Sequence, residues 1–245
     1  MKRALVTGGA GGLGAALVAD LAARGYAVVS VDRAESGTGE CVSRIVCDLA
    51  ERSEVDRALP MIADAGPFDV VVLNAGVSAT GRFESVPAEA YRRLMTVNAE
   101  TPMLMAARLV NAGAVRHLCF VSSLSHFTGY PGAAVYAASK DALAIYATSV
   151  RKPFARRRVS VTLACPGPLR TDHAARHAPA GADESRRLAP EAAARQILDA
   201  TLAGRRLVVP GENARLFALA GRLAPAAVTR QMRRLIFERL EKEVW

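Results

Sequence analysis

Short apolar runs that alternate with longer helical patterns constrain the fold of this chain most. The runs lie at residues 4–7, 27–31, 44–47, 68–73, 117–121, 159–163 and 207–209. Unbroken apolar runs are typical of strands that are covered on both faces. Helical patterns separate most of them, at residues 12–24, 52–64, 87–111, 135–156 and 190–203. This alternation predicts an α/β fold with one doubly wound, seven-stranded parallel sheet and helices on both faces.

We expect a single domain over residues 1–245. The composition is globular, with 51% hydrophobic and 22% charged residues, and no repeat or linker divides the chain. Two segments depart from the alternation. Residues 34–39 are small and polar where a crossover helix is expected, so that helix is short or missing. Residues 171–189 lack a clear period, which favours a surface loop or substrate lid.

The net charge of +9 is unevenly distributed, with −3 over residues 1–100 and +12 over residues 101–245. A basic C-terminal half suits an anionic substrate, an acidic carrier protein or a membrane surface. A solvated, arginine-rich surface is the simpler explanation. Aromatic residues make up only 5% of the chain, which argues against the stacking platforms that bind single-stranded nucleic acid.

Cysteine usage favours the cytoplasm. The four cysteines form no C-x-x-C pair and none has a histidine at zinc spacing, so we expect no metal site. Three lie in apolar runs and indicate buried thiols, namely Cys47, Cys119 and Cys165. The N-terminal apolar run breaks at Gly8, too early for a signal peptide. We also expect no membrane span, because every apolar stretch is interrupted early.

A glycine-rich segment, Thr7 to Gly14, joins the first strand to the first helix. Glycines permit a tight turn and the close approach of a pyrophosphate, and the helix N-terminus adds free N–H groups and a positive dipole end. A G-x-G-x-x-G pattern alone is weak, but its place between a strand and a helix favours dinucleotide binding over a merely flexible loop. The lysine of an ATP-binding loop is missing.

Asp32 ends the second strand, after the glycine segment. A carboxylate there accepts hydrogen bonds from the adenosine ribose and repels a 2′-phosphate, so we expect NAD as the cofactor. Arg33 beside it is able to pair with a 2′-phosphate, which leaves NADP open.

Tyr136 and Lys140 are spaced i, i+4 in a helical pattern and therefore share a face. A free phenol, with a pKa near 10, is a poor base at neutral pH, and a neighbouring ammonium lowers that pKa by favouring the phenolate. Taken alone, the pair also fits an ordinary surface contact.

Polar residues at other strand ends decide the interpretation. Asn74–Gly76 follows the fourth strand, Ser123 the fifth and Pro166–Thr171 the sixth. Parallel strands bring these ends to the one sheet edge where ligands bind. Asn98 lies within a helical pattern, where asparagine is unfavourable. Each residue alone fits a local cap or turn, and together they indicate one site.

These motifs together resemble the short-chain dehydrogenase/reductase family, over residues 3–210. The resemblance rests on Thr7-Gly8-x3-Gly12-x-Gly14, Asp48, Asn74-Ala75-Gly76, Asn98, Ser123, Tyr136-x3-Lys140 and Pro166-Gly167-x-Leu169-x-Thr171. One departure is Leu73, where the family often has a second asparagine. It affects the packing of the cofactor loop and not the chemistry.

The resemblance implies that Tyr136 is the acid/base, that Lys140 binds the nicotinamide ribose and lowers the tyrosine pKa, and that Ser123 holds the substrate oxygen. Asn98 would kink its helix and bind a proton-relay water. The implied cofactor set is Gly8, Gly12, Leu13, Gly14, Asp32, Arg33, Asp48, Leu49, Asn74, Ala75, Gly76, Tyr136, Lys140, Pro166, Gly167, Leu169 and Thr171.

The implied activity is hydride transfer between NAD(H) and a secondary alcohol or ketone. The alternative is an NADP(H)-dependent ketoreductase that acts on an anionic or carrier-bound acyl substrate. A non-catalytic dinucleotide sensor would not need the tyrosine, lysine and serine. Isomerases and dehydratases of this fold usually carry a larger substrate domain. Expected substrate contacts are Ser123, His126, Tyr130 and His173.

A basic C-terminal extension follows the last strand. We expect helices over residues 213–244, with apolar faces that are buried at a subunit interface or at the substrate mouth. A basic amphipathic helix on a membrane surface is the alternative. The family usually forms dimers and tetramers, so we expect a homodimer or homotetramer.

Overall fold

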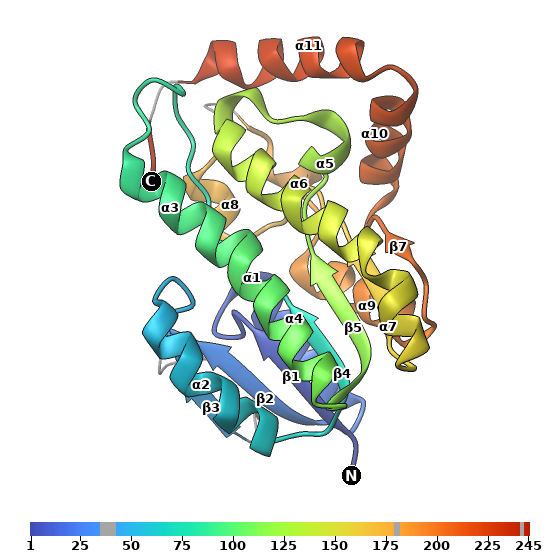
Figure 1. Cartoon of the computed structure of the whole chain (residues 1–245). Helices are drawn as coiled ribbons and strands as arrows, with labels where there is room; N and C mark the ends of the chain where they lie inside the picture. The colour runs from blue at the N-terminus through green and yellow to red at the C-terminus, as the bar shows by residue number, and fades with distance from the viewer. Residues whose placement is uncertain (35–42, 179–181, 241–242) are drawn as a thin grey trace.

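The computed structural model describes residues 1–34, 43–178, 182–240 and 243–245 (Figure 1). Its centre is a parallel sheet in the order β3-β2-β1-β4-β5-β6-β7. The strands are β1 (Arg3–Thr7), β2 (Ala27–Asp32), β3 (Ser43–Val46), β4 (Phe68–Leu73), β5 (Val115–Val121), β6 (Ser160–Ala164) and β7 (Leu207–Val208). The predicted doubly wound, seven-stranded sheet is confirmed in this part of the chain.

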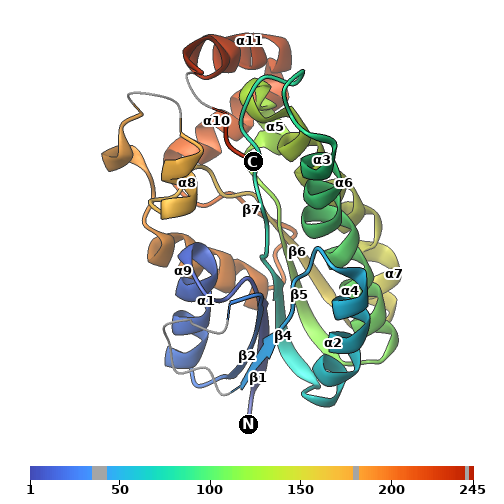
Figure 2. The same ribbon diagram turned by 90° about the vertical axis from the view of Figure 1, so that its left-hand side faces the viewer.

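Two layers of helices cover the sheet (Figure 2). One face carries α1 (Gly12–Ala23) and α9 (Pro190–Leu202), and the other carries α2 (Arg52–Asp64), α4 (Thr101–Asn111) and α6 (Ala134–Ser149). Successive residues of one strand enter different cores: Leu5 packs on the α4 side, whereas Val6 packs on the α1 side. Both faces are buried, and this is why the strands contain no polar alternation.

The strand order places the site. β1 lies between β2 and β4, so the chain winds outward in opposite directions from the β1–β4 pair. The loops that leave the carboxyl ends of these two strands diverge, and a crevice opens at this point of doubly wound sheets. The glycine segment after β1 and the Asn74–Gly76 segment after β4 both begin here.

Two long helices expected from the sequence are interrupted. The pattern over 87–111 forms α3 (Ala88–Met95), a π-helical turn at Thr96–Glu100, and α4. The pattern over 135–156 breaks after Ser149 into α6 and α7 (Arg151–Arg156). Pro153 in α7 has no N–H to donate to the Ser149 carbonyl, which weakens the helix at that point.

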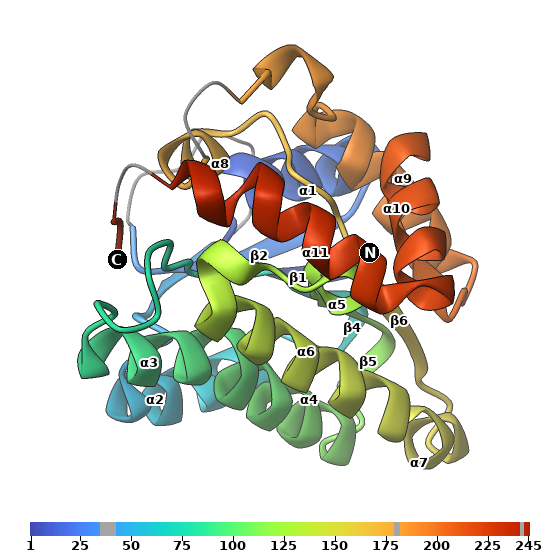
Figure 3. The same cartoon turned by 90° about the horizontal axis from the view of Figure 1, so that it is seen from above.

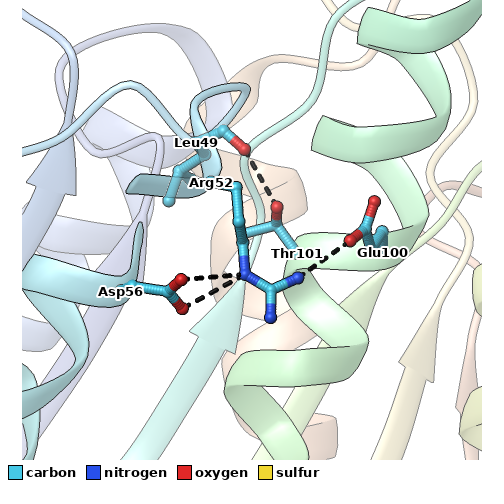
Figure 4. A network of polar contacts seen from close by, with 5 residues as sticks. All are labelled: Leu49, Arg52, Asp56, Glu100 and Thr101. Carbon is cyan, nitrogen blue, oxygen red and sulfur yellow. Dashed lines mark hydrogen bonds and ion pairs between the residues drawn. The ribbon is translucent and has the colours of Figure 1, made fainter. Parts of the chain in front are cut away.

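Polar contacts tie α2 to α4 (Figure 4). The buried Thr101 hydroxyl donates to the Leu49 carbonyl at 2.9 Å. Arg52 pairs with Asp56 and Glu100, both at 3.1 Å, with all three side chains more than half exposed. Exposed ion pairs of this kind contribute little, whereas the buried hydroxyl satisfies a carbonyl that water does not reach. The network holds the Leu49 loop against the start of α4.

The 171–189 segment is more helical than its sequence indicates, whereas the extension forms the expected helices only as far as Leu235 and then a 3-10 turn at Phe237–Arg239. The 171–189 segment contains the short helix α8 (Asp172–Arg176) and a 3-10 turn at Glu184–Arg186. The extension forms α10 (Glu212–Leu223) and α11 (Pro225–Leu235). Seen from above, α11 crosses the carboxyl end of the sheet (Figure 3). It rests on α5 (Ser125–Thr128), where the Thr229 hydroxyl donates to the Thr128 carbonyl at 3.3 Å.

The apolar residues of the extension are only partly buried. Val228 of α11 is buried against the same chain. Three leucines of α10 are exposed, with exposed fractions of 65%, 55% and 77% for Leu216, Leu219 and Leu223. Within one chain the apolar face of α10 therefore stays uncovered, and its burial at a subunit interface stays a prediction. No helix in the described residues is long and apolar enough to cross a bilayer.

Three of the four cysteines, Cys47, Cys119 and Cys165, are buried free thiols, as expected. Cys41 and the shortened crossover after Asp32 fall within residues 35–42, outside the described residues.

Candidate active site

The glycine segment is shaped by contacts that exclude side chains. Gly8 has φ +71°, and a Cβ atom there would lie 2.9 Å from the Ala75 Cα. A Cβ atom on Gly14 would lie 1.7 Å from the Gly8 carbonyl oxygen. The turn and the first turn of α1 therefore approach each other as closely as backbones can. These two positions require glycine for packing.

Thr7 and Asn74 lock the β1 and β4 ends together. The Thr7 hydroxyl accepts the N–H groups of Asn74 and Ala75, both at 3.0 Å. The Asn74 amide donates to the carbonyl oxygens of Thr7 at 3.0 Å and of Gly8 at 3.3 Å. These contacts fix the base of the crevice.

The N-terminus of α1 is open to an anion. Gly11 is the N-cap and provides no side-chain cap for the first N–H groups. A Cβ atom on Gly11 would meet nothing within 4 Å, and Leu13 turns back into the sheet core. Uncapped N–H groups beside open space fit a phosphate-bearing ligand.

Asp32 lies at the end of β2 and faces this loop. Its two oxygens accept the N–H groups of Ala10 at 3.0 Å and Ala34 at 3.1 Å. Each oxygen keeps a further lone pair, so the carboxylate still has capacity for ribose hydroxyls. Arg33 is exposed beside it.

Asp48 follows β3. It accepts the Ala50 N–H at 2.9 Å and pairs with Arg93 at 3.3 Å. The next residue, Leu49, is buried and gives its carbonyl to Thr101. Both predicted cofactor contacts thus lie on a loop held by α3 and α4.

Tyr136 and Ser123 meet at the centre of the site. Burial raises the pKa of Tyr136 above its usual value near 10, and a hydrogen bond from Ser123 lowers it. The Ser123 hydroxyl also accepts the Ser125 N–H at 3.2 Å. The expectation that the Lys140 ammonium lowers the tyrosine pKa stays a prediction. In this structure the largest influence on the phenol is burial, which raises its pKa.

Lys140 is buried, and its ammonium donates to the Val121 carbonyl at 2.9 Å. Burial lowers the pKa of Lys140 to about 8. A Cβ atom on Gly76 would lie 2.9 Å from the Lys140 Nζ. The glycine therefore makes room for the ammonium at the β4 end of the crevice.

Asn98 lies in the π-helical turn and is completely buried. Its amide accepts the Val77 N–H at 2.8 Å and donates to the Val77 carbonyl at 2.9 Å. It also donates to the Ser139 hydroxyl at 2.9 Å, which in turn donates to the Tyr136 carbonyl at 2.8 Å. Asn98 thus joins the β4 loop to the helix that carries the tyrosine. π-helical turns are often found at functional sites.

The loop after β6 closes over the glycine segment. The Pro166 carbonyl accepts the Leu124 N–H at 2.9 Å, and Gly167 lies against α10. Leu169 is buried and pairs with Leu188 of the lid. Thr171 caps α8 by accepting the Ala174 N–H at 3.2 Å, and its methyl lies 3.4 Å from the place of a Gly12 Cβ. The loop therefore reaches the predicted phosphate site.

The predicted substrate contacts divide into two groups. His126 pairs through Nδ1 with Asp141 of α6. Tyr130 lies close enough to Tyr136 to raise its pKa. Desolvation and the charges of Arg176 and Lys140 lower the pKa of His173, whose side chain still meets solvent. Tyr130 and His173 thus lie within electrostatic reach of the catalytic candidates, whereas His126 is bound to the side of α6.

Sequence reasoning missed two supporting hydroxyls. Ser122 donates to the Lys140 carbonyl at 2.8 Å, and Ser139 links Asn98 to the tyrosine helix. Ser139 lies beside Lys140 in the motif, and this adjacency was the only available signal. In the described residues, no three His, Cys, Asp or Glu side chains gather as a metal site would require.

The model of the family described as short chain dehydrogenase matches residues 2–180 of this chain. The chain belongs to the short-chain dehydrogenase family. It is accordingly an oxidoreductase, as the dehydrogenases and reductases among its relatives are. The match covers β1 to α8 and thus contains the glycine segment, the π-helical turn and the tyrosine–lysine pair.

Curated members of the short-chain dehydrogenase family are similar along most of their length. The chain is 36% identical over 187 residues to 1-deoxy-11-beta-hydroxypentalenate dehydrogenase from Streptomyces exfoliatus, covering 69% of this chain and 68% of that one. It is 30% identical over 175 residues to the 3-oxoacyl-acyl-carrier-protein reductase MabA from Mycobacterium tuberculosis, covering 70% of each. A short chain dehydrogenase from Burkholderia cenocepacia, solved in complex with NADP, has a TM-score of 0.79 at 26% identity and covers 95% of this chain and 99% of that one.

Proposed function

We propose that this short-chain dehydrogenase transfers a hydride between NAD(H) and a secondary alcohol or ketone, with Tyr136 as the acid/base. The observation that carries the proposal is the contact between Ser123 and Tyr136, with the buried Lys140 ammonium at the end of β5, on the sheet edge where the uncapped start of α1 also lies. Ligands of doubly wound sheets bind at this edge.

The residues present fit a nicotinamide dinucleotide. The open space at Gly11 and the free N–H groups of α1 suit a pyrophosphate, and the Asp32 carboxylate suits the adenosine ribose. Lys140 and Tyr136 would hold the nicotinamide ribose. When bound, the nicotinamide supplies or accepts the hydride, and the protein contributes positioning and proton transfer.

Proton transfer falls to Tyr136. Because burial raises its pKa, the phenol is protonated at neutral pH and suits the donation of a proton to a carbonyl oxygen during reduction. Oxidation is the reverse step and starts from the phenolate, whose oxygen takes the hydroxyl proton of the alcohol. Ser123 orients the substrate oxygen, and Ser139 with Asn98 fixes the backbone of the tyrosine.

Asp32 favours NAD over NADP in this proposal. A 2′-phosphate on the adenosine ribose would approach a carboxylate that the loop N–H groups hold in place. Steady-state kinetics with NADH and NADPH test the preference. We expect Asp32→Ser to shift the kcat/KM ratio towards NADPH, and an unchanged ratio would refute the role of Asp32.

A second candidate is an NADP(H)-dependent ketoreductase that acts on an anionic or carrier-bound acyl substrate. The similarity to MabA, a relative named for 3-oxoacyl-carrier-protein reduction, and the NADP in the Burkholderia relative favour it. Arg33 is exposed where a 2′-phosphate would lie. A wild-type preference for NADPH would select this candidate.

Tyr136→Phe tests the chemistry itself. A panel of ketones with NADH and NADPH, followed by absorbance, should show turnover by the wild type and a loss of at least about 100-fold in kcat for the variant. Tyr146→Phe is the matched control, because Tyr146 lies on the same helix and donates to the Met103 carbonyl at 3.3 Å. Near-normal turnover by Tyr136→Phe would refute the proposal.

The assembly and location of the protein belong to the same proposal. We expect a homodimer or homotetramer in the cytoplasm, with no nucleic-acid partner. The exposed leucines of α10 are the feature that a subunit interface would cover. Sedimentation velocity measures the assembly, and co-sedimentation with anionic vesicles tests the membrane-surface alternative.

A further inference from the structure

Arg187 is a buried cation in the lid. Its side chain is only 7% exposed, and its Nη1 donates to the Glu184 carboxylate at 3.2 Å. That carboxylate is 57% exposed. A guanidinium has five N–H donors, and burying one is costly unless acceptors meet it. The ion pair with Glu184 occupies one donor on the solvent side.

The backbone of the lid fixes the direction of this side chain. Leu188 pairs with Leu169, and its carbonyl accepts the Arg170 N–H at 3.0 Å. The backbone at Arg187 is extended, with φ −80° and ψ 140°. Neighbouring side chains of an extended segment point to opposite sides. Leu188 packs towards Gly211, 3.4 Å from the place of a Cβ there, so Arg187 points the other way.

Tyr130 lies within reach of the positive charge of Arg187. Burial raises the pKa of Tyr130, and the positive charge of Arg187 lowers it. Tyr130 in turn contributes to the raised pKa of Tyr136. Arg187 also precedes Leu188, which pairs with Leu169 in the loop after β6. The buried cation therefore stands beside the loop that borders the site, within electrostatic reach of Tyr130.

We propose that Arg187 binds an oxyanion of the substrate, a carboxylate or a phosphate, while the carbonyl reacts at Tyr136. This inference rests on the proposed function and names its substrate class. The planar fork of a guanidinium matches both anions in a bidentate manner. Glu184 holds the guanidinium by one N–H, and its exposure lets it turn into solvent when the oxyanion binds.

Matched probes test the proposal. Acetoacetate is compared with its methyl ester, and dihydroxyacetone phosphate with dihydroxyacetone, as substrates with the preferred cofactor. The wild type should favour the anion of at least one pair by roughly ten- to a hundredfold in kcat/KM, the size expected for a charge-assisted contact. The preferred pair distinguishes a carboxylate from a phosphate.

Variants assign that preference to Arg187. Arg187→Gln should abolish it while keeping turnover of the neutral probe, and Arg187→Lys should retain part of it. Arg170→Gln is the matched control, because its guanidinium is exposed in the adjoining segment. Glu184→Gln should strengthen the preference by removing the competing carboxylate.

The outcomes separate this inference from the proposed function. Turnover of neutral ketones without any anion preference in the wild type overturns the role of Arg187 alone. So does an equal loss for both members of a pair, which would indicate a cofactor contact or a folding role. If no probe is turned over, the proposed function fails, and calorimetric titration of dihydroxyacetone phosphate and acetoacetate decides. Binding that Arg187→Gln removes supports the anion site, and no binding refutes it.

Discussion

Gly14→Ala probes the closest approach in the glycine segment. The added Cβ atom would lie 1.7 Å from the Gly8 carbonyl oxygen and 2.7 Å from its carbon, whereas non-bonded atoms pack at roughly 3.5 Å. The clash is with backbone, which cannot rotate away as a side chain does. Relief requires a movement of more than about 1 Å in the β1–α1 turn, and this movement also disturbs the Asn74 amide that donates to Gly8.

The expected cost follows from two opposing effects. Overpacking lowers the free energy of unfolding by about 1–3 kcal/mol. Alanine within a helix raises it by about 1 kcal/mol relative to glycine. Because the clash involves backbone, we expect the upper part of the range and a net loss of about 2 kcal/mol in the free energy of unfolding. For a chain of this size that lowers the Tm by about 4–8 °C.

Gly11→Ala is the matched control. Gly11 has φ −160°, which any residue adopts, and a Cβ atom there would meet nothing within 4 Å. We expect a change below about 1 kcal/mol, the scale of replacing glycine at an N-cap. Urea unfolding followed by circular dichroism compares the two variants. Equal midpoints for Gly14→Ala and Gly11→Ala would show that the close approach does not constrain residue choice.

Three further predictions follow from burial. Burial lowers the pKa of Lys140 in the folded chain to about 8 from its usual 10.5. Between pH 8 and 10.5 the unfolded chain therefore carries a proton on this lysine that the folded chain has lost. The stability of the wild type relative to Lys140→Met should therefore rise by about 3 kcal/mol between pH 8 and 10.5 in urea unfolding, and a flat difference would contradict this. Thr101→Val should cost about 1–3 kcal/mol by leaving the Leu49 carbonyl unsatisfied, whereas Arg52→Ala should cost less than about 1 kcal/mol; equal losses in thermal unfolding would refute the distinction. A Cys41→Ser variant should resist Ellman's reagent at pH 8 until it is denatured. Burial raises the thiol pKa to about 11 for Cys47 and to about 12 for Cys119 and Cys165, so few thiolates are present at that pH. Rapid labelling of the native variant would refute the burial of Cys47, Cys119 and Cys165.

The sheet could be predicted because the residues of each strand reflect its surroundings. In β4, Val71 points to one face of the sheet and Val70 and Val72 point to the other, so both faces of the strand are apolar. A short segment with two apolar faces is typical of a strand that is buried between two layers of helices. The interruption at Asn98 was expected from the family resemblance, which implies a kinked helix, and the hydrophobic pattern of residues 87–111 did not indicate it. The π-helical turn depends on hydrogen bonds from Asn98 to Val77 and Ser139, which are distant in sequence. The helix propensity of single residues does not include such partners.

The candidate site was predictable in its residues and not in its electrostatics. Tyr136 and Lys140 share a helix face, as their spacing requires, and Ser123 was placed at the end of its strand. The protonation state of the Tyr136 phenol depends on how far the surrounding atoms exclude water, and the spacing of residues in the sequence does not predict this. Arg187 shows the same limit: the sequence offers several lid arginines, and only packing against the Leu169 segment buries this one.

Burial changes what the tyrosine–lysine pair does. An exposed pair would favour a phenolate beside an ammonium, because charge attraction would dominate. Here Lys140 is buried and Tyr136 is half-buried, and desolvation raises the pKa of Tyr136 and lowers that of Lys140. Each shift moves its group towards its neutral form. The hydrogen bond from Ser123 opposes the effect of burial at the phenol, because it favours the charged form of Tyr136. The spacing of the tyrosine and the lysine alone therefore does not determine the protonation state of the pair.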